Sequence, residues 1–167
     1  MFKRYLRVGY FAFGWLWILL SSCQSFVFFS SKGGTHSPSV DAQSQYVLDK
    51  RRQYILAEAH RWIGVPYCLG GKENCVDCSG LTQNVYEKVG IFLPRTAEEQ
   101  SKLGKLVPFD ELKEGDLLFF GRGNRITHVA IYAGNGLIIH SASSRGVVRE
   151  NFQTMARSFL FAKRLIE

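Results

Sequence analysis

From Tyr46 onward the spacing of apolar residues changes once, near Glu114, and the change limits the folds that this part of the chain can adopt. Before Glu114 apolar residues recur at helical spacing. After it, short apolar runs alternate with Gly, Asn and Ser turns, which is typical of strands. Helices followed by short strands indicate an α+β domain with an antiparallel sheet. The runs that we expect to form strands are DLLFF, THVAIYA, GLIIHSA, GVVREN and FLFAKRLI.

Two main helices are expected before the strands. The first starts at Tyr46 and stops at Gly64, because glycine is a common helix terminator. The second has the sequence CSGLTQNVYEKV, with Asp77 as its N-cap and Gly90 at its end. Cys78 therefore lies in the first turn of the second helix. The apolar residues that can share one face of the first helix are Val47, Ile55, Leu56, Ala59 and Trp62.

The N-terminal segment has the composition of an export signal. Basic residues at positions 3, 4 and 7 precede an apolar run from Tyr10 to Leu20. This run is shorter than the roughly 20 residues that a membrane-spanning helix needs. It ends in LSSC, which resembles the site at which bacterial lipoprotein signals are cleaved and lipidated. We interpret residues 1–22 as a lipoprotein-type signal and Cys23 as the lipidation site, with an uncleaved N-terminal anchor as the alternative.

The next segment has the composition of a linker. Residues 30–45 are rich in Ser, Gly and other polar residues and lack apolar periodicity. We therefore expect a flexible linker over residues 23–45 and one folded domain over residues 46–167, since 167 residues with 46% apolar content can bury one ordinary core. The expected location is the cell envelope, outside the cytoplasm, with a lipid anchor in a bacterial membrane.

The charge of the chain is mildly basic once the signal is set aside. The formal charge of +7 includes the three basic residues of the signal, and no stripe of Lys and Arg interleaved with aromatic residues follows. The sequence therefore gives no support for a nucleic-acid-binding protein. We expect a monomer.

Cys78 is the candidate nucleophile. A thiol attacks as its thiolate, so a catalytic cysteine needs a lowered pKa or a nearby base. The first turn of a helix favours negative charge, and we expect it to lower the pKa of Cys78. The candidate bases are His128 and His140, which begin one predicted strand and end the next.

The turn between these two strands decides whether the histidines can meet. Gly134, Asn135 and Gly136 separate the strands. A two-residue turn would place the histidines on opposite faces of the sheet, because one step of register exchanges the faces. A three-residue loop that pairs Ala133 with Leu137, or one β-bulge, would place them on the same face. A catalytic pair of histidines therefore requires one of these two geometries.

Several motifs of the sequence resemble those of the NlpC/P60 family of cell-wall cysteine peptidases. The main ones are DCSGL, THVAIYAGNG and IIHSAS, and the supporting ones are PYCLGG, LPRT and LKEGDLLFF. They occur in the family's order, from about Leu56 to Ile166. The resemblance implies a papain-like α+β fold and hydrolysis of peptidoglycan stem peptides, typically between D-glutamate and a diamino acid.

The resemblance also implies roles for individual residues. Cys78 matches the nucleophile, His128 the base and His140 the residue that orients His128. Groove positions of the family match Tyr67, Asp77 and Ser79. No cofactor or metal is expected. The sequence departs from the family at Leu69, where a tryptophan is common, which leaves the aromatic wall of the groove uncertain.

Other functions remain open at the sequence level. The same fold can serve as a catalytically silent wall-binding or scaffold lipoprotein. An amidase or an acyltransferase can also use the same Cys and His pair. The intact set Cys78, His128 and His140 argues against the silent protein.

The remaining cysteines of the domain admit four interpretations. Cys75 and Cys78 could form half of a zinc site or a redox pair, but the chain has no second metal-spaced pair and no βαβ unit. We hypothesise instead a disulfide between Cys68 and Cys75, which would leave Cys78 free. Two buried thiols that never meet are the alternative.

Overall fold

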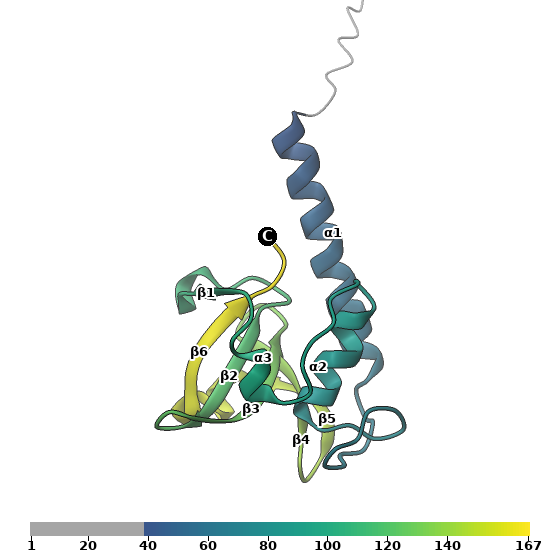
Figure 1. The fold of residues 1–167 in the computed structure, drawn as a ribbon, viewed down its shortest axis with the longest axis vertical. Coiled ribbons are helices and arrows are strands. Elements are labelled where there is room, and N and C mark those ends of the chain that lie inside the picture. Colours follow the sequence, from purple (N-terminus) through teal and green to yellow (C-terminus); the bar gives the residue numbers. More distant parts are fainter. Residues whose placement is uncertain (1–38) are drawn as a thin grey trace, which may run out of the picture. The chain divides into compact units, whose positions relative to one another are not determined.

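The computed structural model describes residues 39–167, which form three α-helices and one six-stranded antiparallel sheet (Figure 1). The expected α+β class is confirmed. The predicted signal, Cys23 and most of the predicted linker lie outside the described residues. No helix within residues 39–167 is long and apolar enough to cross a membrane. The helices are α1 (Val40–Arg61), α2 (Cys78–Glu87) and α3 (Ala97–Gln100).

The sheet has the strand order β1-β6-β2-β3-β4-β5. Its five long strands coincide with the five predicted runs, and the three-residue strand β1 was not predicted. Three short 3₁₀ helices lie beside the strands: η1 (Phe109–Glu111), η2 (Phe152–Thr154) and η3 (Ala156–Ser158). The strands are β1 (Lys105–Val107), β2 (Leu117–Arg122), β3 (Arg125–Tyr132), β4 (Leu137–Ala142), β5 (Gly146–Asn151) and β6 (Phe159–Arg164).

Both faces of the sheet are covered, as β2 illustrates. Side chains alternate between the faces of a strand, so Leu117 and Phe119 pack in the core with the helices, whereas Leu118 and Phe120 pack in a second cluster with Phe152. This explains why LLFF reads as a continuous apolar run rather than an alternating one.

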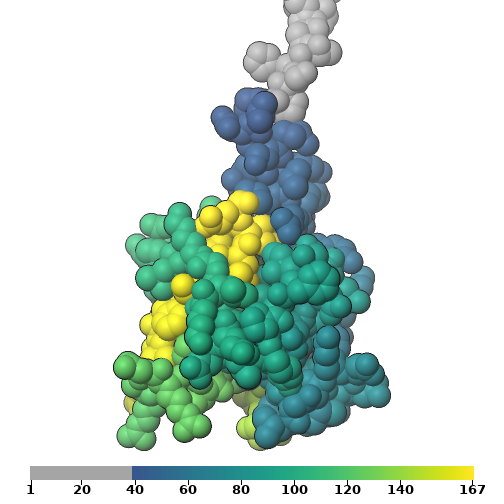
Figure 2. Space-filling view, in the orientation of Figure 1, coloured from purple at the N-terminus to yellow at the C-terminus, as the bar shows by residue number. Residues whose placement is uncertain are grey.

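Helix α1 starts earlier than expected. Ser39 caps it, because its hydroxyl oxygen accepts a hydrogen bond from the amide of Ala42 at 3.3 Å. The last six residues of the predicted linker, 40–45, are therefore helical. Most side chains of these first turns are exposed, and Figures 1 and 2 show the turns standing clear of the rest of the domain.

The buried face of α1 was predicted correctly only in its second half. Ile55 and Ala59 are fully buried, as expected. Val47 is 47% exposed, and its neighbour Leu48 packs against the core instead. Val47 was assigned to the wrong face because the buried stripe of α1 continues through Leu48, seven residues before Ile55, and not through Val47.

The loop between α1 and α2 is closed by the hypothesised disulfide. Cys68 and Cys75 are bonded, with their Cα atoms 5.4 Å apart, and Cys78 is a free cysteine. Gly71 is required inside this loop, since a Cβ atom there would lie 2.0 Å from the sulfur of Cys68 and 2.3 Å from the carbonyl oxygen of Cys75. The disulfide excludes a redox pair of Cys75 with Cys78.

Candidate active site

Asp77 connects the disulfide loop to the start of α2. One carboxylate oxygen of Asp77 accepts a hydrogen bond from the amide of Gly80 (2.7 Å), and the other accepts one from the amide of Gly70 (2.8 Å). The side chain is thus the N-cap of α2 and also holds the loop. Because Cys78 is the first residue of α2, this arrangement fixes the position of its thiol.

Arg95 forms hydrogen bonds with the same carboxylate. Its guanidinium donates to both oxygens of Asp77, at 3.0 Å for Nη1–Oδ1, and Nη1 also donates to the hydroxyl oxygen of Ser79 at 2.9 Å. Burial would raise the pKa of the Asp77 carboxyl, but the hydrogen bonds from Arg95, Gly80 and Gly70 hold it below its usual value. Asp77 is therefore ionised, and both of its carboxylate oxygens accept hydrogen bonds that hold the loop and the start of α2.

Gly80 allows the loop to approach α2 closely. A Cβ atom at this position would lie 2.4 Å from the carbonyl oxygen of Gly71, which is backbone and cannot turn away. Steric contact therefore requires glycine at this position of the motif DCSGL. Glycine lets the loop that carries Tyr67 and Cys68 lie directly over the first turn of α2.

The β3–β4 hairpin brings the two histidines together. Ile131 pairs with Ile139, and the amide of Ala133 donates to the carbonyl oxygen of Leu137 at 2.8 Å. The connection is thus the three-residue loop, and the predicted requirement for a common face is met. Nε2 of His128 and Nδ1 of His140 are 2.8 Å apart.

His140 is held in turn by an acidic residue of β5. Its Nε2 lies 2.7 Å from Oε1 of Glu150, and Nη2 of Arg145 donates to Oε2 of Glu150 at 2.8 Å. In the β4–β5 register Glu150 pairs with Ile138, two residues before His140 and on the same face, so the two side chains are diagonal neighbours. His140 is almost completely buried.

The charge state of Glu150 determines which ring nitrogens carry protons. Burial would raise the pKa of Glu150, but the hydrogen bonds from Arg145 and His140 lower it, so the group is a carboxylate. A carboxylate only accepts hydrogen bonds. Nε2 of His140 is therefore the donor, its Nδ1 accepts from Nε2 of His128, and Nδ1 of His128 is left as the nitrogen with a free lone pair.

Cys78 lies beside the strand that carries His128. The backbone amides of Val129, Ser79 and Cys78 itself are close enough to the thiol to lower its pKa. No side-chain hydrogen bond joins Cys78 to either imidazole within residues 39–167. The structure thus places the thiol next to the backbone of residue 129 and joins the two histidines to each other. Catalytic hydrogen bonds are often long in free enzymes and shorten when substrate binds.

The expected lowering of the thiol pKa is not observed. Burial raises the pKa of Cys78 and outweighs the amides, and the carboxylate of Asp77 raises it further. Burial also lowers the pKa of His128 to about 4, with the neighbouring His140 adding to the effect. At neutral pH both groups are therefore uncharged in the free domain, since desolvation disfavours a charged pair here more strongly than the helix terminus favours it.

A groove of about 500 Å³ opens at Cys78. All three predicted groove residues, Tyr67, Asp77 and Ser79, line it. Leu69, at the position where the family commonly has tryptophan, also lines it and is 86% exposed. The opposite wall comes from α3 and from the start of β3.

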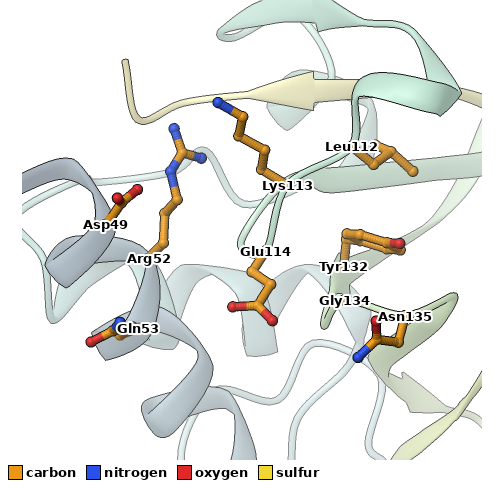
Figure 3. A pocket seen from close by; sticks show the side chains of 9 residues that line it. All are labelled: Asp49, Arg52, Gln53, Leu112, Lys113, Glu114, Tyr132, Gly134 and Asn135. Carbon is orange, nitrogen blue, oxygen red and sulfur yellow. The ribbon is translucent and has the colours of Figure 1, made fainter. Parts of the chain in front are cut away.

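A second hollow of about 500 Å³ lies between α1 and the β3–β4 turn (Figure 3). Asp49, Arg52 and Gln53 of α1 face Lys113 and Glu114 across it. Among the described residues, this hollow shares no lining residue with the groove at Cys78, and no cysteine, serine or threonine lines it. Arg52 is buried, and its Nη2 donates to the carbonyl oxygen of Ile166 at 2.7 Å, which holds the C-terminal end against α1.

Sequence reasoning missed Glu150, Arg145 and Arg95. The sequence LPRT before α3 served only as a supporting motif of the family, although an arginine next to the groove is a natural partner for the capping aspartate. Glu150 had a weaker signal, an acidic residue in a strand next to His140, which becomes informative only once the β4–β5 register is known.

Comparisons with known proteins agree with this geometry. The pattern of the NlpC/P60 family matches residues 64–164. The bifunctional muramidase/DL-endopeptidase CwlT of Bacillus subtilis is 46% identical over 95 residues, which are 54% of this chain and 29% of CwlT. The murein DD-endopeptidase MepS/murein LD-carboxypeptidase of Escherichia coli is 43% identical over 96 residues, 56% of this chain and 51% of MepS.

A solved structure shows the same fold. The NlpC/p60 domain of the peptidoglycan hydrolase SagA is 36% identical, with a TM-score of 0.63 over 68% of this chain and 97% of that domain. The present chain spans about half or less of CwlT and MepS, so the similarity concerns the domain rather than those whole proteins. The matched residues include α2, the β3–β4 hairpin and β5, and the chain belongs to the NlpC/P60 family.

Proposed function

We propose that this domain is a cysteine endopeptidase that cleaves peptidoglycan stem peptides between D-glutamate and a diamino acid. The observation that carries the proposal is the hydrogen-bonded series His128–His140–Glu150, which leaves Nδ1 of His128 free next to the strand segment that contacts Cys78. The names of the relatives CwlT and MepS support an endopeptidase that acts on the cell wall.

The reaction follows from the neutral resting state. As the sulfur of Cys78 attacks the scissile carbonyl carbon, its proton moves to Nδ1 of His128. The C–N bond then breaks, the leaving amine takes that proton, and a thioester remains on Cys78. Water activated by His128 hydrolyses the thioester and regenerates the thiol. His140 orients the ring of His128 through their hydrogen bond. The carboxylate of Glu150, on the other side of His140, stabilises the positive charge that His128 carries while it holds the proton.

The oxyanion of the tetrahedral intermediate needs donors near Cys78. The amides of the first turn of α2 have no partner inside the helix, and those of Cys78 and Ser79 already point toward the sulfur. Such preorganised donors stabilise a developing negative charge without a metal.

Muropeptide analysis tests the function and identifies the bond. The domain from Val40 onward is incubated with purified sacculi, and the products are identified by mass spectrometry. We expect new stem fragments that end in D-glutamate, and none with Cys78→Ala or His128→Ala, because either change removes most of the rate. Cleavage of cross-links alone would indicate DD-specificity, and release of intact stems from the glycan would indicate an amidase. Transfer products would indicate an acyltransferase, and the absence of any product would indicate a wall-binding protein.

We further propose that the full-length protein is a monomeric lipoprotein anchored through Cys23 in the cell envelope. The proposal rests on the charged start, the apolar run and the LSSC sequence. Metabolic labelling with an alkynyl fatty acid should label the wild-type chain and not Cys23→Ser, whereas equal labelling of both would contradict lipidation at this residue. Light scattering of the domain should give the mass of one chain.

A further inference from the structure

A third hollow adjoins the catalytic groove at Thr127. It has a volume of about 730 Å³, and Thr127 lines both this hollow and the groove that contains Cys78. Its other walls are the end of β2, including Arg122, and the segment of η2 and η3, including Arg157. We call this hollow the arginine pocket.

The arginine pocket is positively charged and lacks an internal counter-charge. No Asp or Glu side chain lines it. Arg122 and Arg157 are exposed, and neither forms an ion pair with any residue in 39–167. Arg125, on the wall of the adjoining groove, is likewise exposed and unpaired within this part of the chain. By contrast, Arg95, Arg145 and Arg164 are each held by a carboxylate.

An irregularity of the sheet creates this arrangement. The β2–β3 register shifts between Phe120 and Gly121, and such a bulge redirects the side chains that follow it. A Cβ atom at Gly121 would lie 1.9 Å from the carbonyl oxygen of Arg125, so only glycine fits where the strands approach. The backbone of the β2–β3 turn, which carries Arg122 and Arg125, therefore has a defined conformation beside the groove.

We propose that the arginine pocket binds the terminal carboxylate of the stem peptide, on the carboxyl-terminal side of the scissile bond. This inference rests on the proposed function. Thr127 lines both the groove that contains Cys78 and the arginine pocket, so a stem peptide that extends past Thr127 reaches Arg122 and Arg157. Unpaired guanidinium groups are well suited to a carboxylate, which they bind through paired hydrogen bonds.

Two matched peptides test the proposal. L-Ala-γ-D-Glu-L-Lys-D-Ala is prepared with a free terminal carboxylate and as the terminal amide, and steady-state kinetics are measured for both. We expect the wild-type domain to show a KM about five- to tenfold lower for the acid, in line with an exposed charge-assisted hydrogen bond. Arg122→Gln and Arg157→Gln should raise the KM for the acid toward that for the amide and leave kcat unchanged.

Arg149→Gln provides the matched control. Arg149 is exposed on β5, forms no ion pair within the described residues and lines neither hollow, so it changes the net charge equally. An equal KM for acid and amide in the wild type would overturn the proposal, as would the same KM change in Arg149→Gln as in Arg157→Gln. A loss that is the same for both peptides would indicate general attraction to anionic polymers and would also overturn it. If the wild type cleaves neither peptide, the proposed function fails instead.

Discussion

Glu150 determines the protonation pattern of both histidines, although it lies one side chain away from the base. Its carboxylate accepts from His140, which fixes the tautomer of His140 and, through it, that of His128. A neutral imidazole can otherwise exchange its proton between its two nitrogens. The positions of two protons in the site therefore depend on one carboxylate and on Arg145, which holds it.

Replacing Glu150 by alanine should reduce kcat without changing KM. A positioned base contributes 10²- to 10⁴-fold to a rate, and we expect the loss of its orientation to cost about 10- to 100-fold of this. Nitrogen NMR should show Nε2 of His140 protonated in the wild type and a mixture of tautomers in Glu150→Ala. Asp110→Asn, an exposed residue with the same charge change, should leave both readouts unaltered. An unchanged tautomer together with an unchanged kcat in Glu150→Ala would contradict this role.

The pH profile of the domain should reflect the low pKa of His128. The base must be neutral to accept the thiol proton, so kcat/KM is lost as pH falls through the pKa of His128, about 4. Between pH 8 and about 5.5 we expect an almost constant kcat/KM, because the raised pKa of Cys78 keeps the thiol neutral as well. An acid limb centred near 6.5, the ordinary value for histidine, would show that the pair is charged or exposed in the working enzyme.

Stability should be followed during the same titration. The pKa of His128 is lower in the folded domain than in the unfolded chain, so the contribution of this group to the free energy of unfolding is fully present above about pH 6.5 and decreases toward pH 4. Circular dichroism at each pH separates this loss of folded protein from the protonation of the base.

Among the elements, the loop from Gly64 to Asp77 depends most on covalent closure. Its disulfide joins residues seven positions apart, and the loop-entropy relation gives about 2.5 kcal/mol for a loop of this length. Chemical denaturation of Cys68→Ser/Cys75→Ser should show a loss of this size, and reduction of the wild type should match it. Reductant should not lower the stability of the double variant, and a drop there would assign the effect to another cause.

Elements could be predicted where one short segment of sequence determines them. The start of α2 was predicted from Asp77 as its N-cap. For the two histidines, the sequence limited a common face to a three-residue loop or a β-bulge, and the structure has the loop. Glu150 and Arg95 could not be assigned in this way, because their contacts join segments that meet only through the β4–β5 register and the packing of the chain before α3 onto α2. The balance of burial against the helix terminus at Cys78 likewise depends on packing that no local pattern contains.

At the scale of the whole domain, the two halves of α1 contribute differently to stability. The second half is anchored by Ile55 and Ala59, whereas the first turns are exposed. A domain that starts at Val47 should therefore keep its melting temperature within about 2–4 °C. Ile55→Ala should cost about 2–5 kcal/mol, because it leaves a cavity in the core. A large loss of stability in the truncated domain would show that the first turns contribute to the fold.

Helix α1 also separates Ser39, where the described part of the chain begins, from the groove that contains Cys78. Its 22 residues span about 33 Å, and Tyr67, which lines the groove, follows shortly after its far end. Tension applied at Ser39 is therefore transmitted along a helix axis into the core at Ile55 before it reaches the loop that holds Cys78. The length of α1 and the core around Ile55 therefore separate the groove from a pulling force applied at Ser39.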